Sequence, residues 1–340
     1  MRYKLTIPAR INVLGNPADA CEGDFATISA AVDVRAGAVV EPATGLVLEA
    51  LRRTGSDFSS VLRLEFQPDE IPLPYDGDLD LLKGAVNRLH GYSAEFRVKF
   101  AQRGVRVATW TDVPRQSGLG GSSLFVLLTL AGLREFYDLD RLTHNDYVLA
   151  ELTQRVEAQE LGITCGFADR YVPLFGGIAY LDYRGKLHHQ KIGQEPYVTY
   201  ERLDAYVDDV PLVTISTGIV RDSGDVHGQM RPRYLQEHDA WINTGGETPS
   251  MVRFMSGAWD TAWRGKIARR RFCLCPDAPR SRRQTHGNMA RDRCRSRSRL
   301  GAHLPPAHRP ARTRHRSGLN LIKTIDTTTK TQRSQRKAFS

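Results

Sequence analysis

The chain has 340 residues, of which 41% are hydrophobic and 25% are charged. This composition is typical of a soluble globular protein, and the length leaves room for two domains. No run of about 18 apolar residues is present, so we expect no membrane span. The formal net charge of +10 is unevenly spread. Residues 269–340 hold 20 of the 48 Lys and Arg but only 3 of the 38 Asp and Glu, a net charge of +17, which leaves −7 on residues 1–268.

The N-terminus and the cysteines indicate the compartment. The opening segment, MRYKLTIPARINV, has neither the apolar core nor the cleavage site of a secretory signal. The five cysteines show no paired spacing, which favours reduced thiols. We therefore expect a cytoplasmic protein with no membrane partner.

The first 111 residues are dominated by strand patterns. Residues 25–42 are rich in Ala and Val and suit one or two strands, with Gly37 as a candidate β-bulge. Residues 80–90, DLLKGAVNRLH, have the apolar spacing of a helix. The other segments in this part are predicted as strands: 3–14, 46–52, 61–66, 95–101 and 105–111.

The next part alternates between helices and strands. Residues 124–136 are apolar nearly all round and predict a buried helix. Further predicted elements are helices over 145–160 and 248–268 and strands over 178–182 and 211–217. After Ala268 the sequence becomes rich in Arg, Pro, His and Ser without apolar periodicity. Such a segment buries too little apolar surface to offset its chain entropy, so we expect disorder there.

A Gly- and Ser-rich loop, PRQSGLGGSS at residues 114–123, separates the 105–111 strand from the 124–136 helix. A loop of this kind points backbone N–H groups and the positive end of the helix at one spot, which favours phosphate binding. Its glycines permit positive φ angles, and the hydroxyl of Ser122 or Ser123 suits either a helix N-cap or a Mg²⁺ ion. The loop is neither a Walker A box nor a dinucleotide fingerprint. Taken alone, it is explained as well by a flexible turn with a Ser N-cap.

Three blocks in order resemble the GHMP kinase superfamily, named for galactokinase, homoserine kinase, mevalonate kinase and phosphomevalonate kinase. They are PARINVLGNPAD at 8–19, the loop at 114–123 and GITCGFAD at 162–169. The resemblance covers residues 1–268. It implies a two-domain α+β fold and an ATP- and Mg²⁺-dependent small-molecule kinase, a phosphotransferase with an alcohol group as acceptor. Within the superfamily, GNP at 15–17, the segment 161–170 and the glycine pair at 176–177 look closest to glucuronokinase-like sugar kinases, and SGDVH at 223–227 adds to this likeness. The likeness implies a sugar or sugar-acid substrate.

The resemblance also implies where ATP and Mg²⁺ bind. The phosphate-binding positions of the loop are Pro114, Ser117, Gly118, Leu119, Gly120, Gly121, Ser122 and Ser123. Ser123 and Glu157 are the predicted Mg²⁺ ligands. Glu160 competes with Glu157 because residues three apart share a helix face. The alternative for either carboxylate is a solvated surface group.

The catalytic and substrate residues follow from the same motifs. Asp169 is the predicted base for the attacking hydroxyl, and Arg10 is predicted to stabilise either Asp169 or the transferring phosphate. A helix cap or an ion pair with Arg170 is the alternative for Asp169. Asp19 and Gly166 are the predicted substrate contacts. A carboxylate suits two neighbouring hydroxyls of a polyol, although an Asx turn explains Asp19 equally well.

We divide the chain into an N-terminal kinase ATP-binding domain over 1–185, a partial C-terminal kinase domain over 186–268 and a basic tail over 269–340. These kinases carry a third Gly-rich motif in the second domain, and residues 269–340 contain none. The C-terminal domain is therefore predicted to be incomplete. One hypothesis is that an out-of-frame reading replaced its end. The other is a genuine tail that binds nucleic acid or another polyanion by charge. Base stacking is disfavoured because Phe272 and Phe339 are the tail's only aromatic residues.

Two rival functions stay open from the sequence. One is a mevalonate-type kinase, against which Asp19 weakly favours a sugar. The other is a catalytically impaired protein that binds a nucleotide or a polyanion. The sequence does not predict the oligomeric state.

Overall fold

A computed structural model describes residues 1–15, 26–186, 191–207 and 318–324. The chain divides into two compact units, one formed by residues 1–246 with 314–340 and the other by residues 247–313. All described residues belong to the first unit. Several predictions lie outside the described residues: Asp19, the strand predicted over 211–217, the helix predicted over 248–268 and most of the basic tail.

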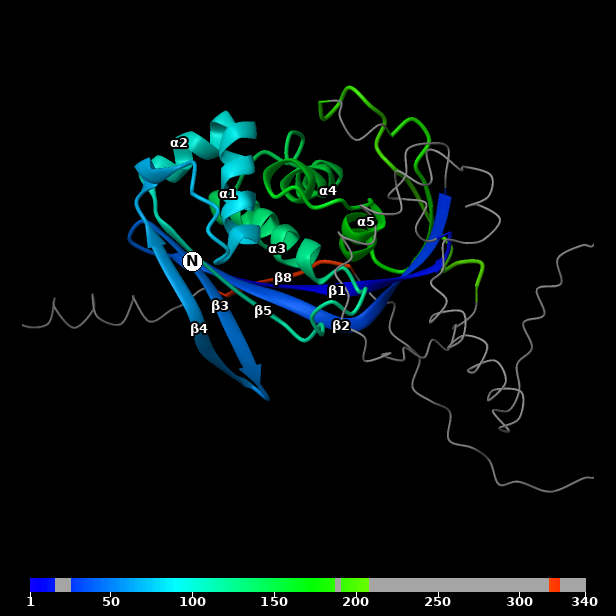
Figure 1. The fold of residues 1–340 in the computed structure, drawn as a ribbon, viewed down its shortest axis with the longest axis horizontal. Coiled ribbons are helices and arrows are strands. Elements are labelled where there is room, and N and C mark those ends of the chain that lie inside the picture. The colour runs from blue at the N-terminus through cyan, green and yellow to red at the C-terminus, as the bar shows by residue number, and fades with distance from the viewer. Residues whose placement is uncertain (16–25, 187–190, 208–317, 325–340) are drawn as a thin grey trace, which may run out of the picture. The chain divides into compact units, whose positions relative to one another are not determined.

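The described part is built on one mixed sheet (Figure 1). The strand order across the sheet is β4, β3, β5, β2, β1 and β8, and β6 and β7 extend the sheet from β2. Strands β3 and β5 pair in parallel, and the other pairings recorded between described strands are antiparallel. The strands are β1 (Arg2–Leu14), β2 (Ala26–Pro42), β3 (Leu46–Thr54), β4 (Asp57–Phe66), β5 (Val105–Thr111), β6 (Ile178–Asp182), β7 (Thr199–Arg202) and β8 (Asn320–Thr324).

Helices cover one face of this sheet, as Figure 1 shows. They are α1 (Asp80–Tyr92), α2 (Ala94–Gln102), α3 (Gly121–Tyr137), α4 (Asp146–Arg155) and α5 (Ala168–Phe175). A short 3-10 helix spans Pro68–Glu70, and a π-helical turn, Val156–Glu160, continues α4. The predicted α+β class is thus confirmed. Within the described ranges, no helix is long and apolar enough to cross a membrane.

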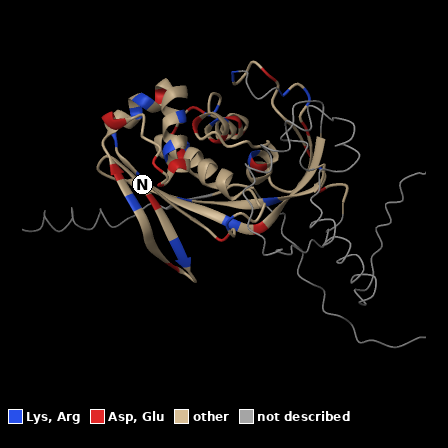
Figure 2. Ribbon diagram, in the orientation of Figure 1, with Lys and Arg blue, Asp and Glu red and all other residues tan. Residues whose placement is uncertain are grey.

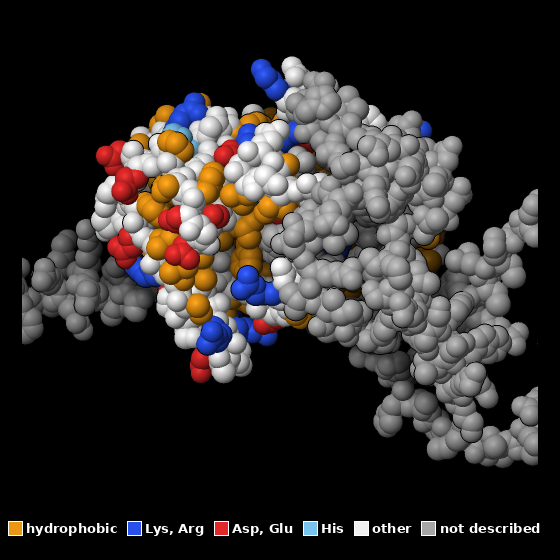
Figure 3. All heavy atoms as spheres, viewed as in Figure 1, with side chains coloured by type: hydrophobic (Ala, Val, Ile, Leu, Met, Phe, Trp, Pro, Cys, Tyr) orange, Lys and Arg blue, Asp and Glu red, His pale blue; other side chains and the backbone are white. Residues whose placement is uncertain are grey.

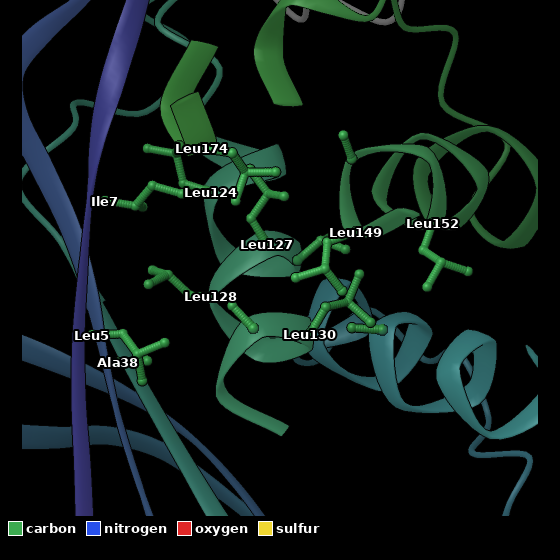
Figure 4. Packing of buried hydrophobic residues seen from close by; sticks show 14 of the residues in the cluster. Leu5, Ile7, Ala38, Leu124, Leu127, Leu128, Leu130, Leu149, Leu152 and Leu174 are labelled. Atoms are coloured by element: carbon green, nitrogen blue, oxygen red, sulfur yellow. The ribbon is translucent and has the colours of Figure 1, made fainter. Parts of the chain in front are cut away.

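The core lies between the sheet and α3 (Figure 4). Leu5 and Ile7 of β1 point toward Leu124 and Leu128 of α3, and all four side chains are fully buried. Because α3 also packs against α1, α4 and α5, it is surrounded by other elements, as its nearly continuous apolar sequence predicts. The first turn of α3, where the Gly/Ser loop ends, is consequently fixed by the core.

The strand predicted over 95–101 is wrong, because Ala94–Gln102 forms α2. The apolar residues Phe96, Val98 and Phe100 alternate as in a strand, but Val98 is 60% exposed. Phe96 and Phe100 are buried four residues apart on one helix face. The Ser93 hydroxyl accepts a hydrogen bond from the Phe96 N–H at 3.0 Å and caps the helix. The capping residue therefore outweighs the alternating pattern.

The bulge in β2 is not at Gly37. The register of β1 against β2 shifts between Pro8 and Ala9, where β2 contributes extra residues before Arg35. Gly37 instead pairs in register with Trp110 of β5. A Cβ atom at Gly37 would lie 2.5 Å from the Trp110 ring, so glycine at this position makes room for the indole.

Candidate phosphoryl-transfer site

The Gly/Ser loop joins the end of β5 to the start of α3. Gln116, Gly118 and Gly120 have φ angles of 52°, 72° and 75°, so every second residue is left-handed. Alternation of this kind turns successive backbone N–H groups toward one concave side, the geometry of an anion nest. No described residue lies within 4 Å of a Cβ atom added at Gly118, so the described part of the chain leaves space beside the loop there.

The two serines at the start of α3 do not cap it. The N-cap residue is Gly120, in a left-handed conformation, and no described side chain caps the helix there. The first N–H groups of a helix have no intrahelical acceptor, and the helix dipole adds positive charge beside them. This helix start therefore suits an anion. Of the two alternatives for Ser122 and Ser123, the structure does not show the helix cap, because both hydroxyls donate to another partner.

That partner is Glu157, in the π-helical turn. The Ser122 hydroxyl donates to Glu157 Oε1 at 2.6 Å, and the Ser123 hydroxyl donates to Oε2 at 2.7 Å. Arg170 donates to the same Oε2. Ser123, Glu157 and Arg170 are all buried. The Glu157 carboxylate is therefore held next to the loop by two hydroxyls and a guanidinium.

Glu160, the competing carboxylate, lies in a different environment. It forms an ion pair with Arg88 at 2.8 Å and accepts a hydrogen bond from the Tyr75 hydroxyl at 3.0 Å. The π-helical turn separates the two carboxylates, because it changes the angular spacing that an α-helix would give residues 157 and 160. The structure thus brings Glu157, and not Glu160, to the serines of the loop.

Asp169 and Arg10 come together beside the same loop. Asp169 lies in the first turn of α5, and its Oδ1 accepts from Arg10 Nε at 2.7 Å and from Arg10 Nη2. Arg10 Nη1 donates to the Gly118 carbonyl at 2.6 Å. A Cβ atom at Gly120 would lie 3.3 Å from Asp169 Oδ2, so this oxygen lies on the side of the loop. Arg10 therefore links Asp169 to the backbone of the candidate phosphate site.

Arg170 is the residue whose role sequence reasoning missed. The sequence suggests Arg170 only as an ion-pair partner of Asp169, but consecutive helical residues do not face each other. This rule is the signal in the sequence that points Arg170 away from Asp169. Arg170 donates to Glu157 and to the Gly166 carbonyl instead. Burial lowers the pKa of Arg170, but the charges of Cys165, Glu157 and Asp169 outweigh burial and raise this pKa above its ordinary value.

The remaining predicted residues lie in varied surroundings. Pro114 and Ser117 are exposed at the start of the loop, whereas Leu119 is buried and packs in the hydrophobic core. Gly121 opens α3. Gly166 is buried, and its carbonyl is an acceptor for Arg170.

The donor set fits Mg²⁺ and phosphate. Mg²⁺ prefers oxygen ligands, and proteins usually hold it by one or two carboxylates together with substrate phosphates. Glu157, Ser122 and Ser123 supply such oxygens next to the loop. Among the described residues there is no cluster of three or more His, Cys, Asp or Glu that could hold a metal by protein groups alone. A site shared between protein and nucleotide phosphates is consistent with both observations.

Comparison with known proteins identifies the family of this region. Residues 80–177, which contain the loop, Glu157 and Asp169, match the family model described as GHMP kinases N terminal domain. Glucuronokinase 1 of Arabidopsis thaliana is 30% identical over 246 residues, which cover 72% of this chain and 65% of the relative. Probable glucuronokinase 2 of the same plant is 31% identical over 251 residues, covering 72% and 64%. The family resemblance predicted from the three motifs is confirmed.

What these matches support depends on the share of each relative that the chain covers and on the sequence identity. The chain spans less than two thirds of the length of both plant relatives. A solved structure, the Lin0012 protein from Listeria innocua, is 17% identical with a TM-score of 0.50 over 72% of this chain and 68% of that chain. That likeness concerns the fold.

Proposed function

We propose that this chain, a member of the GHMP kinase superfamily, transfers the γ-phosphate of ATP to a hydroxyl group of a sugar or sugar acid. The observation that carries the proposal is the placement of the Arg10–Asp169 pair against Gly118 and Gly120 of the loop. The proposed base and the proposed phosphate site are therefore adjacent. The names of the two plant relatives support a sugar acid as the acceptor.

The loop is proposed to hold the phosphates of ATP. Its alternating left-handed residues and the uncapped start of α3 supply N–H donors and the positive end of a helix dipole. Phosphoryl transfer depends mostly on positioning and on stabilisation of charge. Rigid backbone donors fixed by a buried helix meet both needs.

Glu157 and Ser123 are proposed to hold Mg²⁺, with Ser122 beside them. When bound, Mg²⁺ neutralises charge on the phosphate oxygens. Arg170 donates to the Glu157 carboxylate and orients it in a buried position. The metal ligand is then already formed before nucleotide binds.

Asp169 is proposed to accept the proton of the attacking hydroxyl. The hydroxyl oxygen forms a bond to the γ-phosphorus, the bond from that phosphorus to the bridging oxygen breaks, and ADP leaves. The proton goes to Asp169 Oδ2, the oxygen on the side of the loop, while Arg10 holds Oδ1. Arg10 thus orients the base and donates to the loop backbone in the same arrangement.

The test is ADP release by the purified full chain with ATP, Mg²⁺ and D-glucuronate. Asp169→Asn should lower kcat at least about a hundredfold, as expected for the loss of a general base. Asp146→Asn is the matched control, because Asp146 also lies in the first turn of a helix and also pairs with an arginine, Arg134, at 2.7 Å. Equal turnover in Asp169→Asn and the unmodified chain would remove Asp169 from the proposal.

A substrate panel tests the acceptor class. D-Glucuronate, neutral hexoses and mevalonate are compared at equal concentration by kcat/KM. The proposal expects a sugar acid or a sugar to exceed mevalonate by at least about tenfold. Preference for mevalonate would overturn the sugar assignment.

We also propose a cytoplasmic location, where thiols stay reduced.

A further inference from the structure

The segment Gly318–Thr324 lies far along the chain from every other described element, inside the basic tail for which the composition predicts disorder. Residues Asn320–Thr324 nevertheless form β8. This strand pairs antiparallel with Arg2–Thr6 of β1, from Arg2 opposite Thr324 to Thr6 opposite Asn320 (β8 is drawn in red in Figure 1). A segment of the tail therefore supplies a strand to the sheet.

The two residues before β8 contact other elements. The Leu319 N–H lies 3.4 Å from the Leu174 carbonyl in the last turn of α5, and the Leu319 side chain packs against the core. The Gly318 carbonyl lies 3.3 Å from Arg35 Nη2 of β2. The segment Gly318–Thr324 thus touches β1, β2 and α5, and we call it the clasp.

Gly318 is the tightest point of the clasp. A Cβ atom at this position would lie 2.1 Å from the Leu174 carbonyl oxygen, 2.7 Å from the Leu174 carbonyl carbon and 3.0 Å from the Gly176 nitrogen. All three are backbone atoms at the end of α5, which cannot move as a flexible side chain can. Any other residue at position 318 therefore pushes the clasp away from α5.

The clasp joins the two elements that carry the proposed catalytic pair. β1 carries Arg10, and α5 carries Asp169 in its first turn. Without β8, the described sheet would end at β1 and leave backbone N–H and C=O groups of Arg2–Thr6 unpaired, an edge that is prone to fray or to pair elsewhere. Fixing β1 and α5 to one further segment restricts their relative movement.

We propose that the clasp positions Arg10 and Asp169 by locking β1 against α5, with Gly318 as the key positioning residue. The structural half of this inference stands on the contacts of Gly318, Leu319 and β8. The catalytic half rests on the proposed kinase function. A small misplacement of catalytic groups can cost about a hundredfold in rate, so a distant clasp can influence turnover.

The experiment is hydrogen exchange of the full chain, read by mass spectrometry without substrate. Gly318→Ala is compared with Gly91→Ala, because a Cβ atom added at Gly91 would meet no residue of the described ranges within 4 Å. We expect amides of Arg2–Thr6 and of the end of α5 to exchange at least about tenfold faster in Gly318→Ala alone. Unchanged protection of α3 in the same sample shows that the fold survives. Should α3 also lose protection, Leu319→Ala is measured as the milder variant and must show the same local pattern.

Kinetics of the same variants test the catalytic half. Gly318→Ala should lower kcat at least about tenfold while the KM for ATP changes less than about twofold, the signature of lost positioning. Equal exchange of Arg2–Thr6 in both glycine variants and the unmodified chain would overturn the clasp. Faster exchange in a chain that phosphorylates none of the panel substrates would keep the clasp and reject the kinase function. Faster exchange with unchanged kcat would reject the positioning role.

Discussion

Two adjacent residues at the start of α5 serve two different partners. Asp169 faces Arg10 and the loop, whereas Arg170 faces Glu157. Neighbouring helical positions point roughly 100° apart, which makes this division possible. Each acidic group is matched by one guanidinium, as a buried charge requires. The site can therefore hold carboxylates at low solvent exposure before any ligand binds.

Removing Arg170 should destabilise the fold. Arg170→Gln leaves the Glu157 carboxylate buried without its cation, which should lower the free energy of unfolding by about 3–5 kcal/mol. Urea denaturation measures the change. Arg141→Gln is the control, because Arg141 is 57% exposed in its pair with Glu135 and should change stability by less than about 1 kcal/mol. The double variant Arg170→Gln/Glu157→Gln should recover part of the loss; no recovery would contradict the pairing.

The choice between Glu157 and Glu160 is testable at the level of Mg²⁺. Glu157→Gln should raise the Mg²⁺ concentration for half-maximal turnover at least about tenfold, because a charged ligand is replaced by a neutral amide. Glu160→Gln should leave it unchanged, since Glu160 pairs with Arg88. Thermal melting with ATP, with and without Mg²⁺, gives a second readout. A larger effect of Glu160→Gln on both would reverse the assignment.

Residue patterns predict the members of the site but not their contacts. The motifs that hold Arg10, Ser123, Glu157 and Asp169 lie far apart in the chain, and the structure brings these residues to one loop. The preference for Glu157 could not be read from helical spacing because it depends on a π-helical turn. A Cβ atom at Gly84 of α1 would lie 2.8 Å from Val156, which shows how closely α1 approaches this turn. Such tertiary packing is absent from local sequence patterns.

At the scale of elements, α2 shows a competition between two signals. Its apolar residues alternate with period two, but its first residues carry the features of a helix start. Ser93 caps the helix, and Glu95 pairs with Lys99 one turn later at 2.7 Å. The Ser93 hydroxyl also contacts His144 Nε2 at 2.8 Å, which ties the cap to the segment before α4. The strand prediction is wrong because the Ser93 cap and the burial of Phe96 and Phe100 on one helix face outweigh the alternating pattern.

A pair of substitutions tests the register of α2. Phe100→Ala should lower the free energy of unfolding by about 3–5 kcal/mol, because Phe100 is buried against Phe96 and Tyr137. Val98→Ala should change it by less than about 0.5 kcal/mol, since Val98 is exposed. In a strand all three apolar side chains would share one face. Comparable losses in the two variants, measured by urea denaturation, would therefore favour the strand.

A buried ionic network fixes the segment that follows β6 to the helices. Lys186 donates to Glu151 of α4 at 2.7 Å, and Arg155 of α4 donates to Glu195 at 2.7 Å. The Tyr171 hydroxyl of α5 donates to the second oxygen of Glu151 at 2.6 Å. Because α4 leads directly into the turn that carries Glu157, the network also restrains that turn. The site is thus supported from both α4 and α5.

At the scale of the whole molecule, charge divides the chain. On the described ribbon, Lys and Arg are interspersed with Asp and Glu (Figure 2), and the described part of the face in Figure 3 likewise mixes both signs. The basic excess belongs to residues 269–340, of which the structure describes only 318–324. The described surface in view therefore resembles that of an ordinary globular domain rather than a nucleic-acid interface.

The predicted sheet and the observed one differ most at the edge that β8 forms beside β1. Strands β1 to β6 lie close to the segments expected from apolar patterns, because each pattern is local. Pairing of β8 with β1 joins residues more than 300 positions apart. The composition of β8 is also hidden by the Arg-rich sequence around it. Within the described range 318–324, the tail contributes to the fold. An out-of-frame origin for that part must account for a strand that fits β1 and α5.

Acid should weaken the fold through carboxylates whose pKa values are lowered in the native state. Burial alone would raise the pKa of Glu49, but hydrogen bonds with Ser60 and Arg106 and the charges of Arg106 and Arg63 outweigh burial and lower it from 4.5. The unfolded chain then binds the proton more readily than the folded chain. The stabilisation by Glu49 is complete above the unfolded value and is lost as the pH falls through the folded value.

Glu49→Gln should remove this part of the acid sensitivity. The variant is expected to be less stable than the unmodified chain at pH 7, and its stability should fall less between about pH 5 and pH 3. Glu65→Gln is the control, because the Glu65 side chain is 63% exposed on the neighbouring strand β4. Urea midpoints across this range measure the slope. The same steep decline in Glu49→Gln as in the unmodified chain would show that acid acts through other carboxylates, of which Asp182 and Asp204 also have lowered pKa values.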